Sequence, residues 1–296
     1  MNVFLKFLTV YALTKMFVNG KKEAFLDLLD SSFPGMKANI LRCEKLGFPW
    51  DSKPILKERK GEILSHVGLL DYPIAIQGRL YKIGALHAVC TKKTYRGQGF
   101  ATDLIHEALN QAGSQYDFFV LYTEIPHFYE RLSFEHLQEY RFHLPCKRSK
   151  GSRSLIPVAS PQEDDLFKRC FLARVATSNV VWVKDLGFIA AFNALFSTYP
   201  AYWSLQYSPT LNGMISWEVK GKTLHLYDVI AGEMPSLDAI LDHLPEDIEE
   251  VYFYFPPDLF THAATPEPFL YDKGYFMVRG SWPCTEPFMI SPLSRC

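Results

Sequence analysis

The clearest pattern of apolar and polar positions lies between residues 101 and 112. Apolar side chains recur there at intervals of three and four residues, which places them on one face of an α-helix. Gly113 follows and predicts the end of this helix. Residues 117–122 form a short, nearly continuous apolar run, typical of a strand that is covered on both faces. The apolar positions of the predicted helix are Ala101, Leu104, Ile105, Ala108, Leu109 and Ala112.

Two long strands are predicted before this helix, over Glu62–Gln77 and Arg79–Thr91, on either side of a turn at Gln77-Gly78. An earlier helix, Glu23–Phe33, is predicted to end at Pro34-Gly35. A strand, a helix and a second strand in this order form a crossover unit. We therefore predict a fold that contains both helices and strands (α/β). The sheet should be mixed, as in α+β proteins, and helices should cover it.

The second half of the chain repeats this order of elements. A polar, glycine-containing stretch at residues 147–154 separates the halves. We therefore predict two domains in tandem, comprising residues 1–148 and 152–296. The elements predicted in the second domain are a hairpin at Met214–Ile230, a helix at Ser236–Leu244 and strands at Glu250–Phe255 and Lys273–Val278.

The composition is that of a folded globular protein, because hydrophobic residues make up 48% of the chain. The formal net charge of −1 argues against a nucleic-acid partner, which would require a basic surface. The 6 cysteines show no metal-ligand spacing, so we expect no metal site and a reducing, cytoplasmic location. No segment is long and apolar enough to predict a membrane span. The apolar start, Met1–Leu13, imitates a signal peptide, but Lys6 interrupts it and a first β-strand is the preferred interpretation.

The stretch between the second predicted strand and the helix reads YRGQGFA, residues 95–101. Glycines at this position allow the backbone to approach an anion closely and to adopt a positive φ. The first amides of a helix have no intrahelical partner, and the helix dipole favours negative charge there. Arg96 adds a positive charge with several donors. The sequence therefore predicts a pyrophosphate site formed by the amides of Gly97 to Thr102.

At these residues the chain resembles the GNAT superfamily of N-acetyltransferases, whose signature is Arg/Gln-x-x-Gly-x-Gly/Ala. A second segment, HFYERLSF at residues 127–134, is similar to the family's FYEKLGF segment, with Ser133 in place of the usual glycine. In outline the chain is most similar to the Eis-like tandem acetyltransferases, although it stops before their third, sterol-carrier-like domain. The resemblance implies two GNAT-like domains in tandem. The second would be degenerate, because its corner at residues 231–235 (AGEMP) lacks the arginine and the paired glycines.

The resemblance also implies an acetyl-CoA-dependent N-acetyltransferase that transfers an acetyl group directly to a primary amine in a ternary complex. The acceptor is left open between a small polyamine- or aminoglycoside-like molecule and a protein amine. The alternative is a non-catalytic acyl-CoA-binding sensor or scaffold, which would use the same site without turnover. A homo-oligomer is compatible with the sequence. By position in the motif, the residues that would contact CoA are Val89, Cys90, Thr91, Arg96, Gly97, Gln98, Gly99, Phe100, Ala101 and Thr102.

Three side chains are candidates for acid–base chemistry. Tyr129 matches the tyrosine that related enzymes use as a general acid toward the leaving sulfur, and a phenol is neutral at pH 7. His87 is a candidate base because it lies two residues before Val89, on the same predicted strand face, and titrates in the useful range. A related serotonin-type arylalkylamine acetyltransferase has a histidine at the matching position. Glu124, after the strand at 117–122, is the second candidate base.

Structural roles are the alternatives for several of these features. Tyr129 and His87 could serve packing alone, and Cys90 is interpreted as a small buried hydrophobic residue rather than a nucleophile. Two aromatic clusters, Tyr199–Trp203 and Tyr252–Phe255, fit either an acceptor pocket for a cationic amine or core packing. A second half unrelated to the first, acting as a lid or dimerisation domain, is a further alternative that the strand order would decide.

Overall fold

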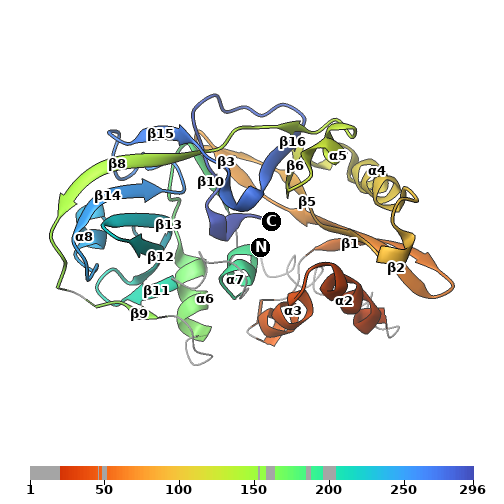
Figure 1. The fold of residues 1–296 in the computed structure, drawn as a ribbon, viewed down its shortest axis with the longest axis horizontal. Coiled ribbons are helices and arrows are strands. Elements are labelled where there is room, and N and C mark those ends of the chain that lie inside the picture. Colours follow the sequence, from red (N-terminus) through yellow and green to blue (C-terminus); the bar gives the residue numbers. More distant parts are fainter. Residues whose placement is uncertain are drawn as a thin grey trace, which may run out of the picture.

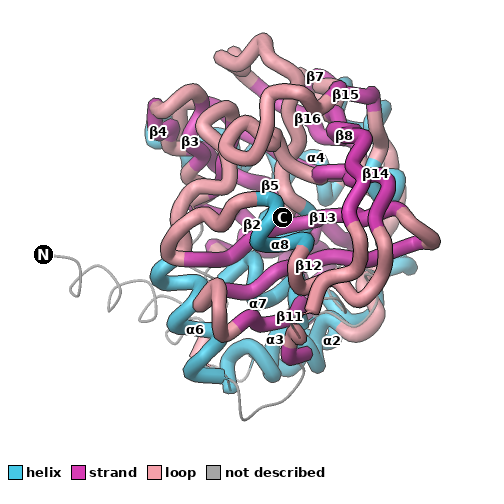
Figure 2. The backbone as a smooth tube through the Cα atoms, turned by 90° about the vertical axis from the view of Figure 1, so that its left-hand side faces the viewer, coloured by secondary structure: helices cyan, strands magenta, loops and turns pink. Residues whose placement is uncertain are grey.

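The computed structural model shows two mixed β-sheets side by side, with the C-terminal residue between them (Figure 1). Figure 2 shows the same arrangement from the side. The predicted first strand at Met1–Leu13 and the aromatic cluster Tyr199–Trp203 lie outside the described residues. The structure describes residues 21–45, 47–48, 52–152, 154–157, 164–184, 188–195 and 205–296.

The first sheet has six strands and is covered by helices on both faces. Its strands are β1 (Lys53–Arg59), β2 (Glu62–Asp71), β5 (Ile83–Thr91), β6 (Phe118–Thr123), β7 (Glu135–His136) and β16 (Tyr275–Arg279). They follow the order β1-β2-β5-β6-β16-β7, in which only β5 and β6 are parallel. Helix α4 (Phe100–Ala112) packs on one face. Helices α2 (Lys21–Ser32) and α3 (Met36–Lys45) lie on the other face, below β1 and β2 in Figure 1.

The predicted crossover is confirmed, because α4 connects the parallel strands β5 and β6. Its apolar stripe is buried against β1, β2 and β5, and Ala101 alone among the predicted positions is half-exposed. Burying a leucine or isoleucine side chain of this stripe contributes about 1.5–3 kcal/mol. The buried residues are Leu104, Ile105, Ala108, Leu109 and Ala112.

The two long strands predicted around Gln77-Gly78 are each divided into two. Pro73 follows β2, and because proline has no N–H to donate, the first ladder stops there. The chain then forms a separate hairpin of β3 (Ile74–Ile76) and β4 (Arg79–Tyr81). The predicted turn is confirmed, since Gln77 and Gly78 have φ values of 48° and 77°, as a tight hairpin turn requires. β3 also pairs with β10 (Val181–Val183), which completes a three-stranded sheet.

The second sheet has seven strands in the order β15-β8-β14-β13-β12-β11-β9. They are β8 (Tyr140–Arg148), β9 (Ile156–Pro157), β11 (Leu205–Ser208), β12 (Gly213–Lys220), β13 (Thr223–Ala231), β14 (Ile248–Phe253) and β15 (Thr265–Pro268). The predicted hairpin is confirmed as β12 and β13, whereas the predicted helix at Ser236–Leu244 is reduced to α8 (Leu237–Leu241). Helices α6 (Asp164–Ala173) and α7 (Phe188–Leu195) lie between the sheets (Figure 1). Among the described helices, none has the length and apolar character needed to cross a bilayer.

Each sheet is completed by a strand from the other half of the chain. β16 inserts between β6 and β7, and β8 inserts between β14 and β15, both in antiparallel orientation. The strand order β2-β5-β6-β16 in the first sheet therefore repeats as β12-β13-β14-β8 in the second. This repeat supports two related units rather than an unrelated lid. The boundary at residues 148–152 stays a prediction, and one strand crosses it in each direction.

Candidate functional site

The glycine bend between β5 and α4 is open to solvent. Gly97 and Gly99 have φ values of 77° and 82°, a backbone conformation that costs other residues about 1–2 kcal/mol. A Cβ atom placed on either glycine would have no neighbouring atom within 4 Å. The bend therefore needs glycine for its backbone conformation and presents bare main chain to solvent.

The start of helix α4 has no side-chain cap. Gly99 is the N-cap residue, and its carbonyl accepts the first helical bond from the amide of Asp103 at 3.0 Å. The amides of Phe100, Ala101 and Thr102 therefore precede the first intrahelical bond. Uncapped amides at the positive end of a helix dipole favour an anionic group.

Two cations lie beside this helix start. Arg96 is exposed, and its Nε donates to the carbonyl of Thr91 at 3.2 Å, which fixes the guanidinium beside the bend. Lys57 of β1 lies with its Nζ 5.5 Å from the centre of the Phe100 ring. Neither Arg96 nor Lys57 has a carboxylate partner among the described residues. Sequence reasoning missed Lys57, because no motif connects β1 to the helix start and only the sheet brings them together.

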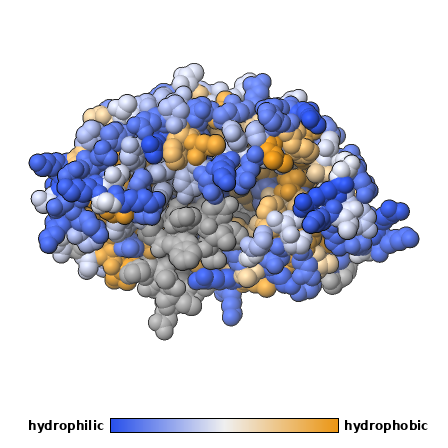
Figure 3. All heavy atoms as spheres, viewed as in Figure 1, coloured by the Kyte–Doolittle hydropathy of each residue, from blue (hydrophilic) through white to orange (hydrophobic). Residues whose placement is uncertain are grey.

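The parallel strands β5 and β6 separate soon after they begin. Their pairing covers only Ile83–Phe118, Gly84–Phe119 and Ala85–Val120. The rest of β5, including Val89, Cys90 and Thr91, therefore has a partner strand only on the β2 side. Main-chain groups on the other side of this segment face the opening between the strands, and Figure 3 shows apolar surface gathered around β5.

A β-bulge interrupts β5 at this opening. Cys90 pairs with His66 and His87 pairs with Gly68, so that Ala88 and Val89 together oppose the single residue Val67. Ala88 has a φ of 48°, in the left-handed region that alanine rarely adopts. The peptide between Ala88 and Val89 therefore lies outside the regular pairing of both neighbouring strands.

Comparison with known proteins agrees with this geometry. Residues 19–137 match the family model described as an acetyltransferase (GNAT) domain. The matched segment contains strands β1 to β7 and helices α4 and α5, so this part of the chain resembles a GNAT acetyltransferase domain. No curated protein resembles the chain closely enough in sequence to count as a match.

Solved structures extend the likeness over both sheets. A conserved Enterococcus faecalis protein, a probable N-acyltransferase, is similar over 88% of this chain and 70% of its own, with a TM-score of 0.55 and 13% identity. GCN5-related N-acetyltransferases from Kribbella flavida (15% identity, 68% of that chain) and Anabaena variabilis (14%, 70%) are each similar over 88% of this chain, with TM-scores of 0.51. At these identities the likeness shows a shared fold.

His87 and Val89 lie on opposite faces of β5, so the prediction that they share a face is wrong. The bulge at Ala88 shifts the alternation of side chains by one residue. Val67 and Val89 pack under α4, whereas the neighbouring Gly68 faces the His87 ring on the other side. His87 Nε2 lies 2.7 Å from the Ser52 hydroxyl, and burial lowers the pKa of His87 to about 3.

Cys90 lies in the core formed with α2 and α3. It is 6% exposed, and burial raises the pKa of its thiol to about 11. A thiol that stays protonated at neutral pH is a poor nucleophile. The structure therefore supports the interpretation of Cys90 as a buried apolar residue, and its carbonyl accepts a hydrogen bond from the Ser65 hydroxyl of β2 at 2.8 Å.

Tyr129 lies in the short helix α5 (Pro126–Glu130), on the same face of the sheet as α4. Its ring packs edge-on against Phe128 and Phe134, and the residue is 6% exposed. Burial raises the pKa of its hydroxyl to about 12, so the phenol stays protonated at neutral pH. Among the described residues, none forms a hydrogen bond with this hydroxyl, which leaves its proton available.

Glu124 is exposed directly after β6, at the end of the strand that no longer pairs with β5. Burial raises the pKa of the Asp272 carboxyl, and the negative charge of Glu124 raises it further. Asp272 and Lys273 have φ values of 50° and 58°, two consecutive positive values without glycine. The structure thus brings a strained turn of the second half next to the candidate base.

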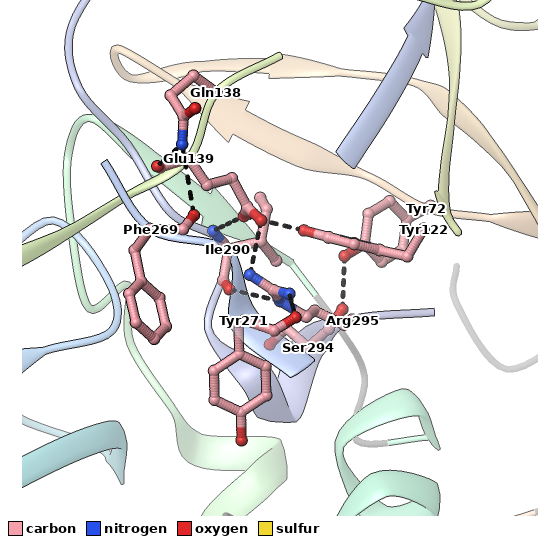
Figure 4. Close-up of polar contacts among 9 residues, drawn as sticks. All are labelled: Tyr72, Tyr122, Gln138, Glu139, Phe269, Tyr271, Ile290, Ser294 and Arg295. Carbon is pink, nitrogen blue, oxygen red and sulfur yellow. Dashed lines mark hydrogen bonds and ion pairs between the residues drawn. The ribbon is translucent and has the colours of Figure 1, made fainter. Parts of the chain in front are cut away.

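A buried polar cluster that sequence reasoning missed joins the two halves (Figure 4). Arg295 Nη2 lies 2.6 Å from Glu139 Oε2, and Tyr122 donates to Glu139 Oε1 at 3.1 Å. The guanidinium also lies over the Tyr122 and Tyr271 rings, 4.5 and 5.0 Å from their centres. Burial raises the pKa of Glu139, and the Arg295 charge opposes this shift. No sequence signal could reveal this pair, because its members are 156 positions apart.

The aromatic cluster Tyr252–Phe255 is divided between two faces of the second sheet. Phe253 lies in the core under α8, whereas Tyr252 faces the other side with Tyr227 and Tyr271. Arg141 lies 4.1 Å from the centre of the Tyr252 ring, so an internal cation already occupies one aromatic face. An acceptor pocket at this cluster stays a prediction.

Proposed function

We propose that the protein is an acetyl-CoA-dependent N-acetyltransferase that works through its first sheet. The observation that carries this proposal is the uncapped start of α4 beside an open glycine bend, at the point where β5 and β6 separate. The GNAT domain and the probable N-acyltransferase with a similar fold support the same reaction class.

The described residues fit CoA, because no side chain fills the bend and two unpaired cations flank it. The main chain of Val89, Cys90 and Thr91 would hold the pantetheine arm along β5. Arg96, Lys57 and the amides of the bend and helix start would hold the pyrophosphate. The bend and helix-start residues are Gly97, Gln98, Gly99, Phe100, Ala101 and Thr102. When bound, acetyl-CoA supplies the acyl group and a thiolate leaving group.

Tyr129 is the proposed general acid. Its pKa of about 12 keeps the phenol protonated, and its hydroxyl has no competing partner among the described residues. Proton donation by a positioned side chain contributes a factor of about 10² to 10⁴ in rate.

Of the two candidate bases, Glu124 is favoured over His87. An imidazole with a pKa of about 3 is a weak proton acceptor at neutral pH, and His87 already pairs with Ser52. Glu124 is exposed directly after the end of β6 that no longer pairs with β5, where an amine can approach. His87 would then help to position the acceptor. The acceptor remains either a small polyamine- or aminoglycoside-like molecule or a protein amine.

The test combines calorimetry with CoA and acetyl-CoA and an assay of thiol release with a panel of amines. We expect the protein to bind both acetyl-CoA and CoA and to release CoA only when an amine is present. The Tyr129→Phe variant should lower kcat for this release about 10²-fold. Tyr227→Phe, at a buried tyrosine of the second sheet, is the matched control and should retain activity. Binding without amine-dependent release would instead indicate an acyl-CoA sensor or scaffold, and absence of binding would overturn both.

A further inference from the structure

A buried histidine on β2 contacts the bulge of β5 from behind. His66 is 0% exposed, and its ring packs edge-on against Phe25 of α2, 5.0 Å between ring centres. Its Nδ1 lies 2.8 Å from the carbonyl oxygen of Ala88. A carbonyl oxygen only accepts, so Nδ1 carries the proton and the other nitrogen, Nε2, is bare. Nε2 is buried without a hydrogen-bond partner.

This hydrogen bond fixes a peptide that strand pairing does not hold. Ala88 and Val89 oppose one residue of β2, and the pairing with β6 ends at Ala85. In a trans peptide the carbonyl and the following amide point in opposite directions. A bond that holds the Ala88 carbonyl toward β2 therefore aims the Val89 amide away from β2, toward the opening between β5 and β6.

We propose that His66 is a positioning residue that holds the Val89 amide toward the acyl carbonyl of the bound thioester. This inference rests on the proposed function, since it requires acetyl-CoA along β5. The neutral ring suits this task, because burial lowers the pKa of His66 to about 4 and it keeps one donor directed at Ala88 at neutral pH. The unfavourable φ of 48° at Ala88 makes an added restraint necessary, because strain would otherwise relax the bulge.

The test compares variants that keep or lose the Nδ1 donor. The Asn side-chain nitrogen lies near the position of His Nδ1, so His66→Asn can still donate to Ala88, whereas His66→Leu cannot. We expect His66→Leu to lower kcat/KM for acetyl-CoA about 10- to 100-fold. This is less than the roughly 10²- to 10³-fold loss on deleting a donor to a reacting carbonyl, because the Val89 amide is misdirected rather than removed. The Kd of CoA, which has no acyl carbonyl, should change less than about threefold. His66→Asn should restore most of the activity.

A control separates positioning from a general loss of stability. His243 is also a buried histidine, with Nδ1 2.8 Å from the carbonyl of Ala239, but it lies in the second half of the chain. His243→Leu should lower the melting temperature as His66→Leu does and leave kcat/KM unchanged. If His66→Leu does not fold, His66→Gln replaces it, because the Gln nitrogen lies near the position of Nε2 and cannot make the Ala88 contact.

Two results would overturn the inference. One is a His66→Leu or His66→Gln protein as active as His66→Asn, and the other is an equal loss of affinity for CoA and acetyl-CoA. A wild-type protein that binds acetyl-CoA and transfers nothing would remove the proposed function instead. The ratio of CoA to acetyl-CoA affinity in the same variants would still test the His66 contact.

Discussion

The two corners that join parallel strands in this molecule have the same connectivity and differ in the capping of their helices. In the first sheet, α4 is 13 residues long and begins at Gly99 without a side-chain cap. In the second, α8 is 5 residues long, and the hydroxyl of Ser236 accepts a bond from the Ala239 amide at 3.2 Å. One helix start is left for a ligand, whereas the other is satisfied by the protein itself.

The second corner is also more closely surrounded by other atoms than the first. A Cβ atom on Gly232 of the second corner would lie 3.6 Å from the Ala173 carbonyl, whereas Gly97 and Gly99 have nothing within 4 Å. Beyond the parallel pairing of the second sheet, a buried ion pair between Arg174 and Asp228 fills the space, at 3.1 Å. The second unit has the same strand order as the first, and its corner contacts Ala173 and is capped by Ser236.

The largest expected effect concerns strands β8 and β16, each of which belongs to the sheet of the other half. It tests whether the first unit can fold without the second. A fragment ending at Gly151 lacks β16 and leaves the edges of β6 and β7 unpaired. We expect it to show no cooperative thermal unfolding by circular dichroism and to aggregate. Adding the fragment 152–296 in trans should restore folding. A fragment that melts cooperatively alone would show that the first unit is independent of the exchanged strand.

Acid should destabilise the bulge region of the first sheet. The pKa values of His66 and His87 fall from 6.5 in a free histidine to about 4 and about 3 in the folded protein. Between these values the unfolded chain binds more protons, so stability is lost as pH falls from about 6.5 toward 4, by about 3 kcal/mol for His66. Urea unfolding at pH 7 and pH 4.5 measures this loss. His87→Gln cannot titrate and should lose less stability; the same pH dependence in both proteins would contradict the assignment.

Alanine substitutions at Gly99 and Gly232 test directly which of the two corners is open to the ligand. Gly99→Ala places a methyl group on a residue with φ of 82°, at a strain of about 1–2 kcal/mol, and in the path of the ligand. We expect the Kd of acetyl-CoA to rise about tenfold or more. Gly232→Ala makes only ordinary contacts at 3.6 and 3.7 Å and should leave the Kd unchanged. Calorimetry on both variants measures the Kd of acetyl-CoA. An equal rise in Kd for Gly99→Ala and Gly232→Ala would contradict the distinction between the two corners.

The cap of α8 should give the smallest effect. Ser236→Ala removes the oxygen that accepts from Ala239 and is expected to lower stability by about 1 kcal/mol. Ser236→Asn keeps a capping oxygen and should be close to wild type in melting temperature. Acetyl-CoA binding should be the same in both variants, and a change in binding would connect the second corner to the site.

Features that depend on a few neighbouring residues could be predicted from the sequence alone. The apolar stripe of α4 follows from intervals of three and four residues, and the bend follows from glycines that alone adopt φ near 80° at no cost. The candidate bend, the helix start and the parallel crossover were therefore predictable, as were the hairpins at Gln77-Gly78 and Lys220–Lys222.

Features that depend on distant partners became evident only in the folded molecule. The bulge at Ala88 arises where β5 meets β2, and it placed His87 on the face opposite Val89. Contacts between residues far apart in the chain also bring Lys57 to the start of α4 and pair Arg295 with Glu139. In the same way, β8 of the first half belongs to the second sheet and β16 of the second half belongs to the first sheet. Local rules fix a backbone conformation over a few residues, whereas pairing register and buried charge depend on which distant segment supplies the partner.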